Sequence, residues 1–413
     1  MNTYERSNVE NRKNQNTSSS QIQAPSLRLK TSFYLIFDQI SDQISVVKQV
    51  LSVKILMLAD SNSSHTFKWV QALSEKGVEI CLFGLSAPKL DYSDMKGVQV
   101  HSGDLSVKRT IGALSKAKYL KSVPYLKKLL REFQPDIVHA HFATSYGLLA
   151  SRLKHPVLFI SVWGTDVYRF PKQSILHRSI FKHILKKANF LLSTSKDMAR
   201  ELALYTNQHI QILPFGVDTK KFCPSESKQR ETITIGCIKW IEENYGIQYL
   251  FQAFAKLKNE AFYPQLKLLI VGDGSYLNEL KRLCQQLAIE GQVSFAGRVD
   301  HSQVVEYHQQ MDIEVYLSHF ESFGVSAVEA AACGNPLIVS RVGGLPEVVE
   351  DGNTGFIVAS KDVDQLKQKL EVLINDSALR SQLGQAGRTK VLQEYSWEQN
   401  VEQMLDIYRR ALS

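Results

Sequence analysis

Cysteine is scarce in this 413-residue sequence, and long apolar runs are absent from it. The five cysteines are scattered, odd in number and without a CxxC pair, which argues against a disulfide framework or a zinc site and fits a reducing compartment. No uncharged apolar stretch reaches the roughly 18 residues of a spanning helix, so none is expected. The N-terminal stretch is polar and Asn/Ser-rich, unlike a secretory signal, so we expect a cytoplasmic protein.

Two motif classes are also missing. No G-x-G-x-x-G follows the first predicted strand of either half of the chain, which argues against an NAD-type oxidoreductase. No recognition-helix, zinc-finger or RNP-type pattern accompanies the net charge of +8, so nucleic acid is not an expected partner.

The positive charge lies in the first half. Residues 1–218 hold 29 Lys and Arg against 16 Asp and Glu, whereas residues 219–413 hold 20 against 25. Two runs contain no acid at all, Leu105–Arg131 with eight basic residues and Arg169–Lys187 with six. They are either solvated helix faces or a surface that meets anionic lipid or an anionic substrate, where each basic residue near a membrane contributes about 1 kcal/mol.

Apolar periodicity divides the chain. Residues 1–50 form an N-terminal extension whose first 25 residues we expect to be disordered. Residues 27–51 have helical apolar spacing, for a helix that lies on a membrane or, the favoured alternative, packs on the protein body. From residue 53, short buried strands such as "VKILMLAD" alternate with helices such as "HTFKWVQALSEKG", and the alternation restarts at "TITIGCI". We therefore expect an α/β fold of two doubly wound parallel domains, 51–217 and 218–395, which face each other across a ligand-binding cleft.

The stretch "SHFESFGVSAVEAAACGNP", residues 318–336, carries the strongest chemical signal. Glu321 and Glu329 flank a predicted turn at Phe323-Gly324 from a strand into a helix. The free N–H groups and dipole of a helix start can receive a phosphate, and carboxylates accept hydrogen bonds from sugar hydroxyls. This arrangement suits a nucleotide sugar. The alternative is that Glu321 only stabilises the helix dipole and Glu329 is an ordinary helix residue.

The longer stretch "SHFESFGVSAVEAAACGNPLIVSRVGGLPEVVEDGNTGFIV" resembles the E-x7-E signature region of the family-4 retaining glycosyltransferases, the group 1 enzymes. Other segments agree in the same order, among them "HAHFATSYG", "WGTDVY", "LPFGVDTKKF", "IVGDGSYLNEL" and "FAGRVD". The resemblance spans about residues 53–413 and implies a GT-B fold of two Rossmann-like domains. The C-terminal domain would hold the nucleotide-sugar donor and the N-terminal domain the acceptor, with a helix at about 396–413 packing back on the latter. It implies neither a metal nor another cofactor.

Site residues carry over by position. Glu321 matches the glutamate near the donor sugar, and Glu329 the one that binds the nucleotide ribose. By the same resemblance, the backbone of Phe323, Gly324 and Val325 would meet the donor sugar and diphosphate. Gly272 would lie in a loop that borders the nucleotide, and Arg298 and Val299 would lie beside the base.

The leaving diphosphate usually meets two cations in this family. Lys239 matches the first and would stabilise the departing charge. Asn244 stands where the second is expected, so what replaces that cation is open.

Three polar residues in the N-terminal half are candidates for the cleft: Asp166, His65 and His141. Asp166 ends "WGTD", where many relatives read H-G-x-D, and would contact a sugar hydroxyl, orient the acceptor or merely cap a helix. His65 would cap the next helix or touch the acceptor. We expect His139 and His141 to point to opposite faces of one strand, His141 into the cleft and His139 into the core.

Taken together, we expect a retaining glycosyltransferase that uses a UDP- or GDP-sugar. Its acceptor would be a lipid-linked or surface polysaccharide such as lipopolysaccharide, reached from the cytoplasmic face of a membrane. One alternative is a non-catalytic nucleotide-sugar-binding subunit, which Asn244 and Trp163 keep open, and another is a soluble transferase with a small-molecule acceptor. The single D-x-D, Asp362-Val363-Asp364, is interpreted as a helix cap rather than a metal motif.

Overall fold

The computed structural model describes residues 53–103, 117–225, 231–258 and 260–413. The predicted extension at 1–50 and helix at 27–51 lie outside the described residues, as do residues 104–116 of the first basic run.

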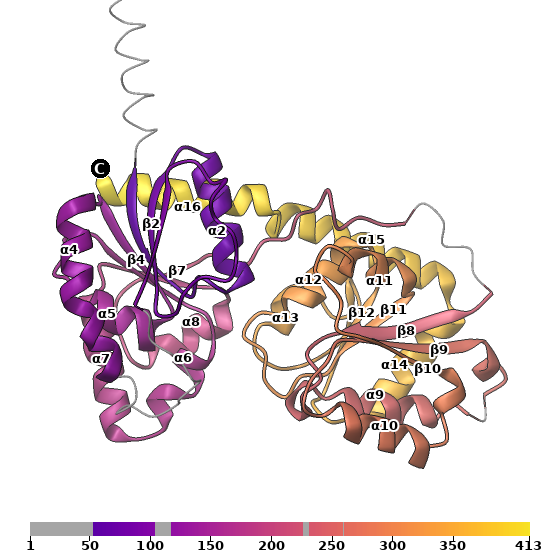
Figure 1. The fold of residues 1–413 in the computed structure, drawn as a ribbon. Coiled ribbons are helices and arrows are strands. Elements are labelled where there is room, and N and C mark those ends of the chain that lie inside the picture. The colour runs from indigo at the N-terminus through magenta and orange to yellow at the C-terminus, as the bar shows by residue number, and fades with distance from the viewer. Residues whose placement is uncertain (1–52, 104–116, 226–230, 259) are drawn as a thin grey trace, which may run out of the picture. The chain divides into compact units, whose positions relative to one another are not determined.

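The first sheet has seven strands in the order β3-β2-β1-β4-β5-β6-β7, and every paired register in it is parallel. Its strands are β1 (Lys54–Leu58), β2 (Glu79–Gly84), β3 (Val98–Ser102), β4 (Ile137–His141), β5 (Leu158–Val162), β6 (Phe190–Ser193) and β7 (Ile210–Ile212). Side chains alternate along β1, so that Leu56 and Leu58 pack into one core and Ile55 and Met57 into another. A sheet that is buried on both faces requires helices on both faces (Figure 1).

Those helices are α2 (Ser64–Glu75), α4 (Val123–Phe133), α5 (Leu148–Ala150), α6 (Thr165–Tyr168), α7 (Ile175–Lys187) and α8 (Lys196–Ala203). The apolar pattern of "SYGLLASRL" predicts a helix over 145–153, but the helix is shorter, because a π-helical turn (Ala143–Gly147) precedes the three-residue α5.

The last helix of the chain, α16 (Trp397–Leu412), contributes to the core of this first sheet. Its Val401 and Met404 share a cluster with Ile55 and Met57. Its Tyr408 hydroxyl lies 2.6 Å from Nδ1 of the buried His139. The C-terminal helix α16 is therefore part of the same core as β1.

The second sheet has six parallel strands in the order β10-β9-β8-β11-β12-β13. They are β8 (Ile233–Ile238), β9 (Leu266–Val271), β10 (Val293–Gly297), β11 (Ile313–Tyr316), β12 (Leu337–Ser340) and β13 (Gly355–Val358). Helices α9 (Ile247–Ala255), α10 (Leu277–Gln286) and α14 (Val363–Asn375) cover one face, and α11 (Val304–Gln310), α12 (Val325–Ala332) and α15 (Ser377–Glu394) the other (Figure 1). A short helix, α13 (Leu345–Val348), follows β12.

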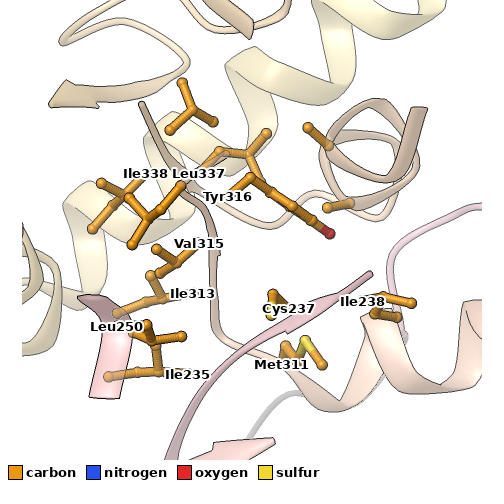
Figure 2. Packing of buried hydrophobic residues seen from close by; sticks show 14 of the residues in the cluster. Ile235, Cys237, Ile238, Leu250, Met311, Ile313, Val315, Tyr316, Leu337 and Ile338 are labelled. Carbon is orange, nitrogen blue, oxygen red and sulfur yellow. The ribbon is translucent and has the colours of Figure 1, made fainter. Parts of the chain in front are cut away.

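The centre of this sheet is filled by side chains from neighbouring strands. Figure 2 shows Ile235 and Cys237 of β8 near Ile313 and Val315 of β11, with Leu250 of α9 packed beside them. Strand order reverses between β8 and β11, and such a switch point opens a crevice at the carboxyl ends of the strands. A ligand site is therefore expected after these two strands.

Two parallel-sheet α/β domains confirm the predicted fold class. In the part of the chain that the structure describes, no helix is both long enough and apolar enough to cross a bilayer.

Candidate active site

The two strands at the switch point carry an ion pair at their carboxyl ends. Lys239 directly follows β8, and Glu321 lies in the loop after β11. Nζ of Lys239 is 2.5 Å from Oε2 of Glu321, and the two side chains are only 14% and 13% exposed. Burial opposes the ammonium charge, but the Glu321 carboxylate outweighs it and raises the pKa of Lys239. The site thus holds a fixed cation beside a carboxylate at the place where the fold directs a ligand.

Two further side chains support this pair. Nζ of Lys239 lies 4.8 Å from the ring centroid of Tyr245, which belongs to the short helix Glu243–Tyr245. The Ser318 hydroxyl donates to Oε2 of Glu321 at 3.3 Å.

Asn244 lies at the expected place of the second cation. Its backbone oxygen accepts the N–H of His319 at 2.8 Å. Its side chain brings no positive charge, so Lys239 is the cation of this loop.

The turn after Glu321 starts α12 abruptly. Gly324 is the N-cap residue with φ of 103°, a left-handed conformation that glycine adopts without steric cost. A β-carbon there would lie 2.8 Å from Leu345, so the turn is also tightly packed. Phe323 is buried at 2% exposure and anchors the loop, and Val325 begins the helix. The first N–H groups of α12 therefore open toward the switch point, and no side chain caps them.

Glu321 does not act as that cap, because its carboxylate pairs with Lys239. Glu329 is not an ordinary helix residue either. Its side chain is 7% exposed, and Oε1 lies 3.0 Å from Nε2 of His301. Burial works against the ionised form, but His301 and His308 together lower the pKa of Glu329 to about 2. Both glutamates are therefore partly or fully buried carboxylates with cationic or polar partners, as a hydroxyl-binding site requires.

Gly272 is required by the close approach of two strand ends. It has φ of 138°, donates its N–H to the carbonyl of Gly297 at 2.8 Å, and leaves no room for a β-carbon against the carbonyl of Lys239. Arg298 is exposed, with its guanidinium 5.9 Å from the ring centroid of Trp240, and Val299 packs on the domain core. Trp240 is itself 58% exposed, so the pair forms an open platform beside the Lys239 loop.

The candidates in the N-terminal half lie in or beside a cluster of aromatic rings. His65 lies in the first turn of α2, its ring stacked 4.5 Å from Phe215 and 6.1 Å from Trp163. It makes no helix cap, since the N-cap residue is Ser63. Burial, followed by the nearby Lys68, lowers the pKa of His65 to about 4, so the ring is neutral at pH 7.

The predicted orientation of the two histidines on β4 was wrong. His139 and His141 face the same side, with ring centroids 4.6 Å apart, because residues two apart on a strand share a face. His139 belongs to the core as expected, bonded to Tyr408 and to the hydroxyl of Ser161 at 2.8 Å. His141 is also buried, at 2% exposure, and burial lowers its pKa to about 3. It lies 4.7 Å from the Trp163 ring, and its Nδ1 has no hydrogen-bond partner among the described residues.

Asp166 is fully buried and shapes a loop. Its carboxylate accepts the N–H groups of Ala143 and Gly164, each at 2.9 Å, and of Trp163 at 3.3 Å. Burial raises its pKa even though these bonds act in the opposite direction. Of the roles predicted for Asp166, this geometry favours the structural one, and a direct contact with substrate stays a prediction.

The D-x-D segment serves as a cap. Asp362 accepts the N–H of Gln365 at 2.9 Å at the start of α14, and Asp364 pairs with Lys256. Within the described ranges, no group of three or more His, Cys, Asp or Glu side chains is arranged to hold a metal ion.

Three residues beside the site were not predicted from the sequence. Trp240 and Tyr245 flank the predicted Lys239 and Asn244, and His301 follows the predicted Arg298-Val299 segment by two positions. The sequence signal that could have identified these three residues is that each lies next to, or two positions from, a predicted site residue. No sequence signal marked His308 and Glu314, which lie behind Glu329.

Comparison with known proteins identifies the class. The model of the glycosyl transferases group 1 matches residues 218–390, and a glycosyl transferase 4-like model matches residues 54–195. The chain belongs to the group 1 glycosyltransferases and is a glycosyltransferase.

Among curated relatives, it is 27% identical to D-inositol 3-phosphate glycosyltransferase of Arthrobacter sp. (strain FB24), over 83% of this chain and 88% of that protein. It is 28% identical to N-acetyl-alpha-D-glucosaminyl L-malate synthase of Bacillus anthracis, over 66% and 74%. Among solved structures, sucrose-phosphate synthase of Thermosynechococcus elongatus has a TM-score of 0.75 at 21% identity and covers 87% of this chain and 98% of its own. Anabaena HepE in complex with UDP has a TM-score of 0.71 at 18% identity, over 87% and 100%. Both structures share the fold.

Proposed function

We propose that this protein transfers a sugar from a nucleotide-sugar donor to a lipid-linked or polysaccharide acceptor at the inner face of a membrane, with retention at the anomeric carbon. The buried Lys239–Glu321 pair carries the proposal, because it lies where strand order reverses and directly ahead of α12. A diphosphate bound at the helix start would meet the Lys239 ammonium, and Glu321 and Glu329 would accept hydrogen bonds from the sugar and ribose hydroxyls.

Catalysis would rest on charge and position. As the sugar–phosphate bond breaks, negative charge grows on the leaving diphosphate, and Lys239 stabilises it at a poorly hydrated site. Glu321 is held by Lys239 and Ser318 and acts on the sugar hydroxyls rather than as a nucleophile. We therefore expect departure and attack on the same face of the sugar, which retains its configuration.

One structural relative also suggests a nucleoside-diphosphate sugar as the donor, since Anabaena HepE has been crystallised with UDP-glucose.

The membrane part of the proposal has its own support. On α7, Ile175 is 90% exposed and Leu176 is 62% exposed, and exposed basic residues follow them along the helix. Apolar side chains ringed by cations suit the surface of an anionic bilayer.

The test is turnover of UDP-, GDP- and ADP-sugars, followed as released nucleotide, with and without a membrane lipid extract. We expect one donor to turn over only with extract, and Glu321→Gln to abolish turnover without loss of folding. The anomeric configuration of the isolated product, read by NMR coupling constants, checks retention.

Each contrary result is informative. A donor that binds but never turns over with any extract would support the binding-subunit alternative. Turnover onto a water-soluble acceptor, independent of lipid, would support the soluble transferase. An inverted product would overturn the proposed stereochemistry alone.

A further inference from the structure

A chain of buried polar groups lies behind Glu329, on the side away from solvent. His308 is the fifth residue of α11, and Glu314 lies on β11. Both are 0% exposed and lie beside the apolar core of the domain. A charged side chain without a partner is strongly destabilising at such a depth, so these residues must compensate one another.

Glu314 is the fixed end of this chain. Its Oε1 lies 2.8 Å from Nδ1 of His308 and accepts the side-chain N–H of Asn335 at 2.6 Å. Its Oε2 accepts the hydroxyl of Tyr316 at 2.7 Å. Three donors from a helix, a loop and the strand itself hold this carboxylate, so it cannot turn independently of the sheet.

His308 connects the two carboxylates. Burial acts to lower its pKa, but Glu314 and then Glu329 outweigh burial and raise it to about 9. The ring is therefore an imidazolium at neutral pH, with a proton on each nitrogen. Nδ1–H donates to Glu314, and Nε2–H faces Oε2 of Glu329 at 3.9 Å. Within the described residues, Nε2 has no closer acceptor.

Glu329 thus has an inner and an outer oxygen. Oε2 faces His308, and Oε1 lies 3.0 Å from Nε2 of His301, whose side chain is 45% exposed. A ligand that arrives from solvent meets Oε1 and can displace His301, while Oε2 keeps its buried partner. The carboxylate is consequently oriented before any ligand binds, and such preorganisation reduces the free-energy cost of binding.

We propose that Glu314 and His308 are positioning residues: they form a buried relay that aims the carboxylate of Glu329 at the ribose hydroxyls of the donor nucleotide. The inference rests on the proposed function, and it adds two residues that never touch the ligand. A carboxylate without His308 would lose its inner partner and rotate or take up a proton, and its hydrogen bonds to a diol would weaken.

Other groups around the ring do not replace it. The charged groups at the ring are Glu314 of β11 and Glu329 of α12. Tyr316 contacts Glu314, and His301 contacts the outer oxygen of Glu329. Lys68 of α2 also lies near Glu329; burial lowers the pKa of this lysine, and the Glu329 carboxylate acts in the opposite direction. Burial, and after it the nearby Glu314 carboxylate, raises the pKa of the Cys237 thiol on β8 to about 12, which keeps the thiol uncharged. In the described chain, His308 is the cation between the two carboxylates.

The experiment compares binding of UDP with that of 2′,3′-dideoxy-UDP by calorimetry at pH 7, and repeats it with the guanosine pair. The two ligands of a pair differ only in the hydroxyls that Glu329 would hold. A hydrogen bond to a charged group contributes about 1.5–3 kcal/mol, so wild type should prefer the ribose form by about tenfold or more. In Glu314→Gln and His308→Asn the preference should fall below about threefold, with the affinity for the dideoxy form changed less than about twofold.

Met311→Leu is the matched control, since the Met311 side chain packs in the same core and its bond to His308 is a backbone one that the substitution keeps. This variant should keep the wild-type preference. A folded His308→Asn or Glu314→Gln protein with the wild-type preference overturns the relay. Equal losses for both ligands of a pair also overturn it, because they would mean a general structural role. If wild type binds none of these four nucleotides and does not bind ADP either, the proposed function itself fails.

A second measurement needs no variant. The wild-type preference for the ribose form should decline as pH rises through about 9, where His308 loses its proton. Base and diphosphate are common to both ligands, so their own titration cancels in the ratio. A preference that stays constant up to pH 10 overturns the relay even if every variant fails to fold.

Discussion

Gly343 lies against the carbonyl oxygen of Glu321 so closely that a β-carbon at position 343 would overlap it. The neighbouring Gly344 donates its N–H to the same oxygen at 3.1 Å. The two glycines of "VGGLPE" thus clamp the backbone of the loop that carries Glu321. This contact connects two motifs that are 22 residues apart in the sequence.

Gly343→Ala should displace the Glu321 loop and reduce kcat/KM by about a hundredfold, the usual cost of a misplacement of about 1 Å in an active site. Gly352→Ala is the matched control, because Gly352 also has a positive φ (76°) but has nothing within 4 Å of an added β-carbon. The control should lose about 1–2 kcal/mol of stability and keep its activity. Equal activity in the two variants would show that the clamp does not position Glu321.

Lys239→Met should lower kcat by about a hundredfold to a thousandfold, as removal of one preorganised charge at a developing anion does. The control is Lys256→Met, which removes a surface partner of Asp364 with side chains 47% and 74% exposed, and it should change kcat less than about twofold. Steady-state kinetics with the donor found in the panel measure both. A loss confined to KM would show that Lys239 binds donor and transition state equally, contrary to its proposed role.

The fold was predictable because strands buried on both faces leave continuous apolar runs. Residues 268–271 form such a run, and Gly272 ends it. Val98–Ser102 and Ile210–Ile212, which were not predicted, are edge strands with half-buried patterns that the apolar signal does not mark. The π-helical turn at 143–147 was missed because its composition is that of an ordinary helix.

The site was predictable only in part. Lys239 and Glu321 are 82 residues apart, and the topology that makes β8 and β11 neighbours brings them together. His308 and Glu314 gave no signal, because a lone polar residue in a helix or strand is typical of a solvated face. Only tertiary packing shows that each is the other's partner.

Stability should depend on pH through His308. Its pKa in the folded protein, about 9, is above the ordinary value of 6.5, so its contribution is complete below pH 6.5 and is lost as pH rises through 9. The difference in unfolding free energy between wild type and His308→Asn, measured in urea, should therefore shrink between pH 7 and pH 10. His183→Asn, which removes an exposed histidine of α7, should show no such trend. A gap that is independent of pH would mean that His308 is neutral in the fold.

Glu329 gives the opposite pH dependence. Its pKa of about 2 in the folded protein is below the ordinary value of 4.5, so its contribution is complete above pH 4.5 and is lost as pH falls through 2. Glu329→Gln should consequently be less stable than wild type at pH 6, and the gap should close toward pH 2. Acid unfolding followed by circular dichroism measures this, and a gap that widens at low pH would contradict it.

Membrane attachment should depend on one face of α7. Lys182 and Lys186 follow Ile175 by seven and eleven residues, which places the three side chains on the same side of the helix. All three are exposed. Lys182→Gln with Lys186→Gln should weaken binding to vesicles containing phosphatidylglycerol by about thirtyfold, since each lysine contributes about 1 kcal/mol near an anionic surface. Co-sedimentation at low salt measures it, and high salt should remove most of the difference.

The exposed apolar residues at the start of α7 are tested separately. Ile175→Ser with Leu176→Ser keeps every charge and should also weaken binding, because both side chains would enter the headgroup region. Leu204→Ser is the control, since Leu204 is 61% exposed and lies just beyond α8. If the charge variant loses affinity and the apolar variant does not, α7 only attracts the membrane and does not insert. If wild type fails to bind anionic vesicles at low salt, the acceptor is soluble, and the exposed face of α7 has another role.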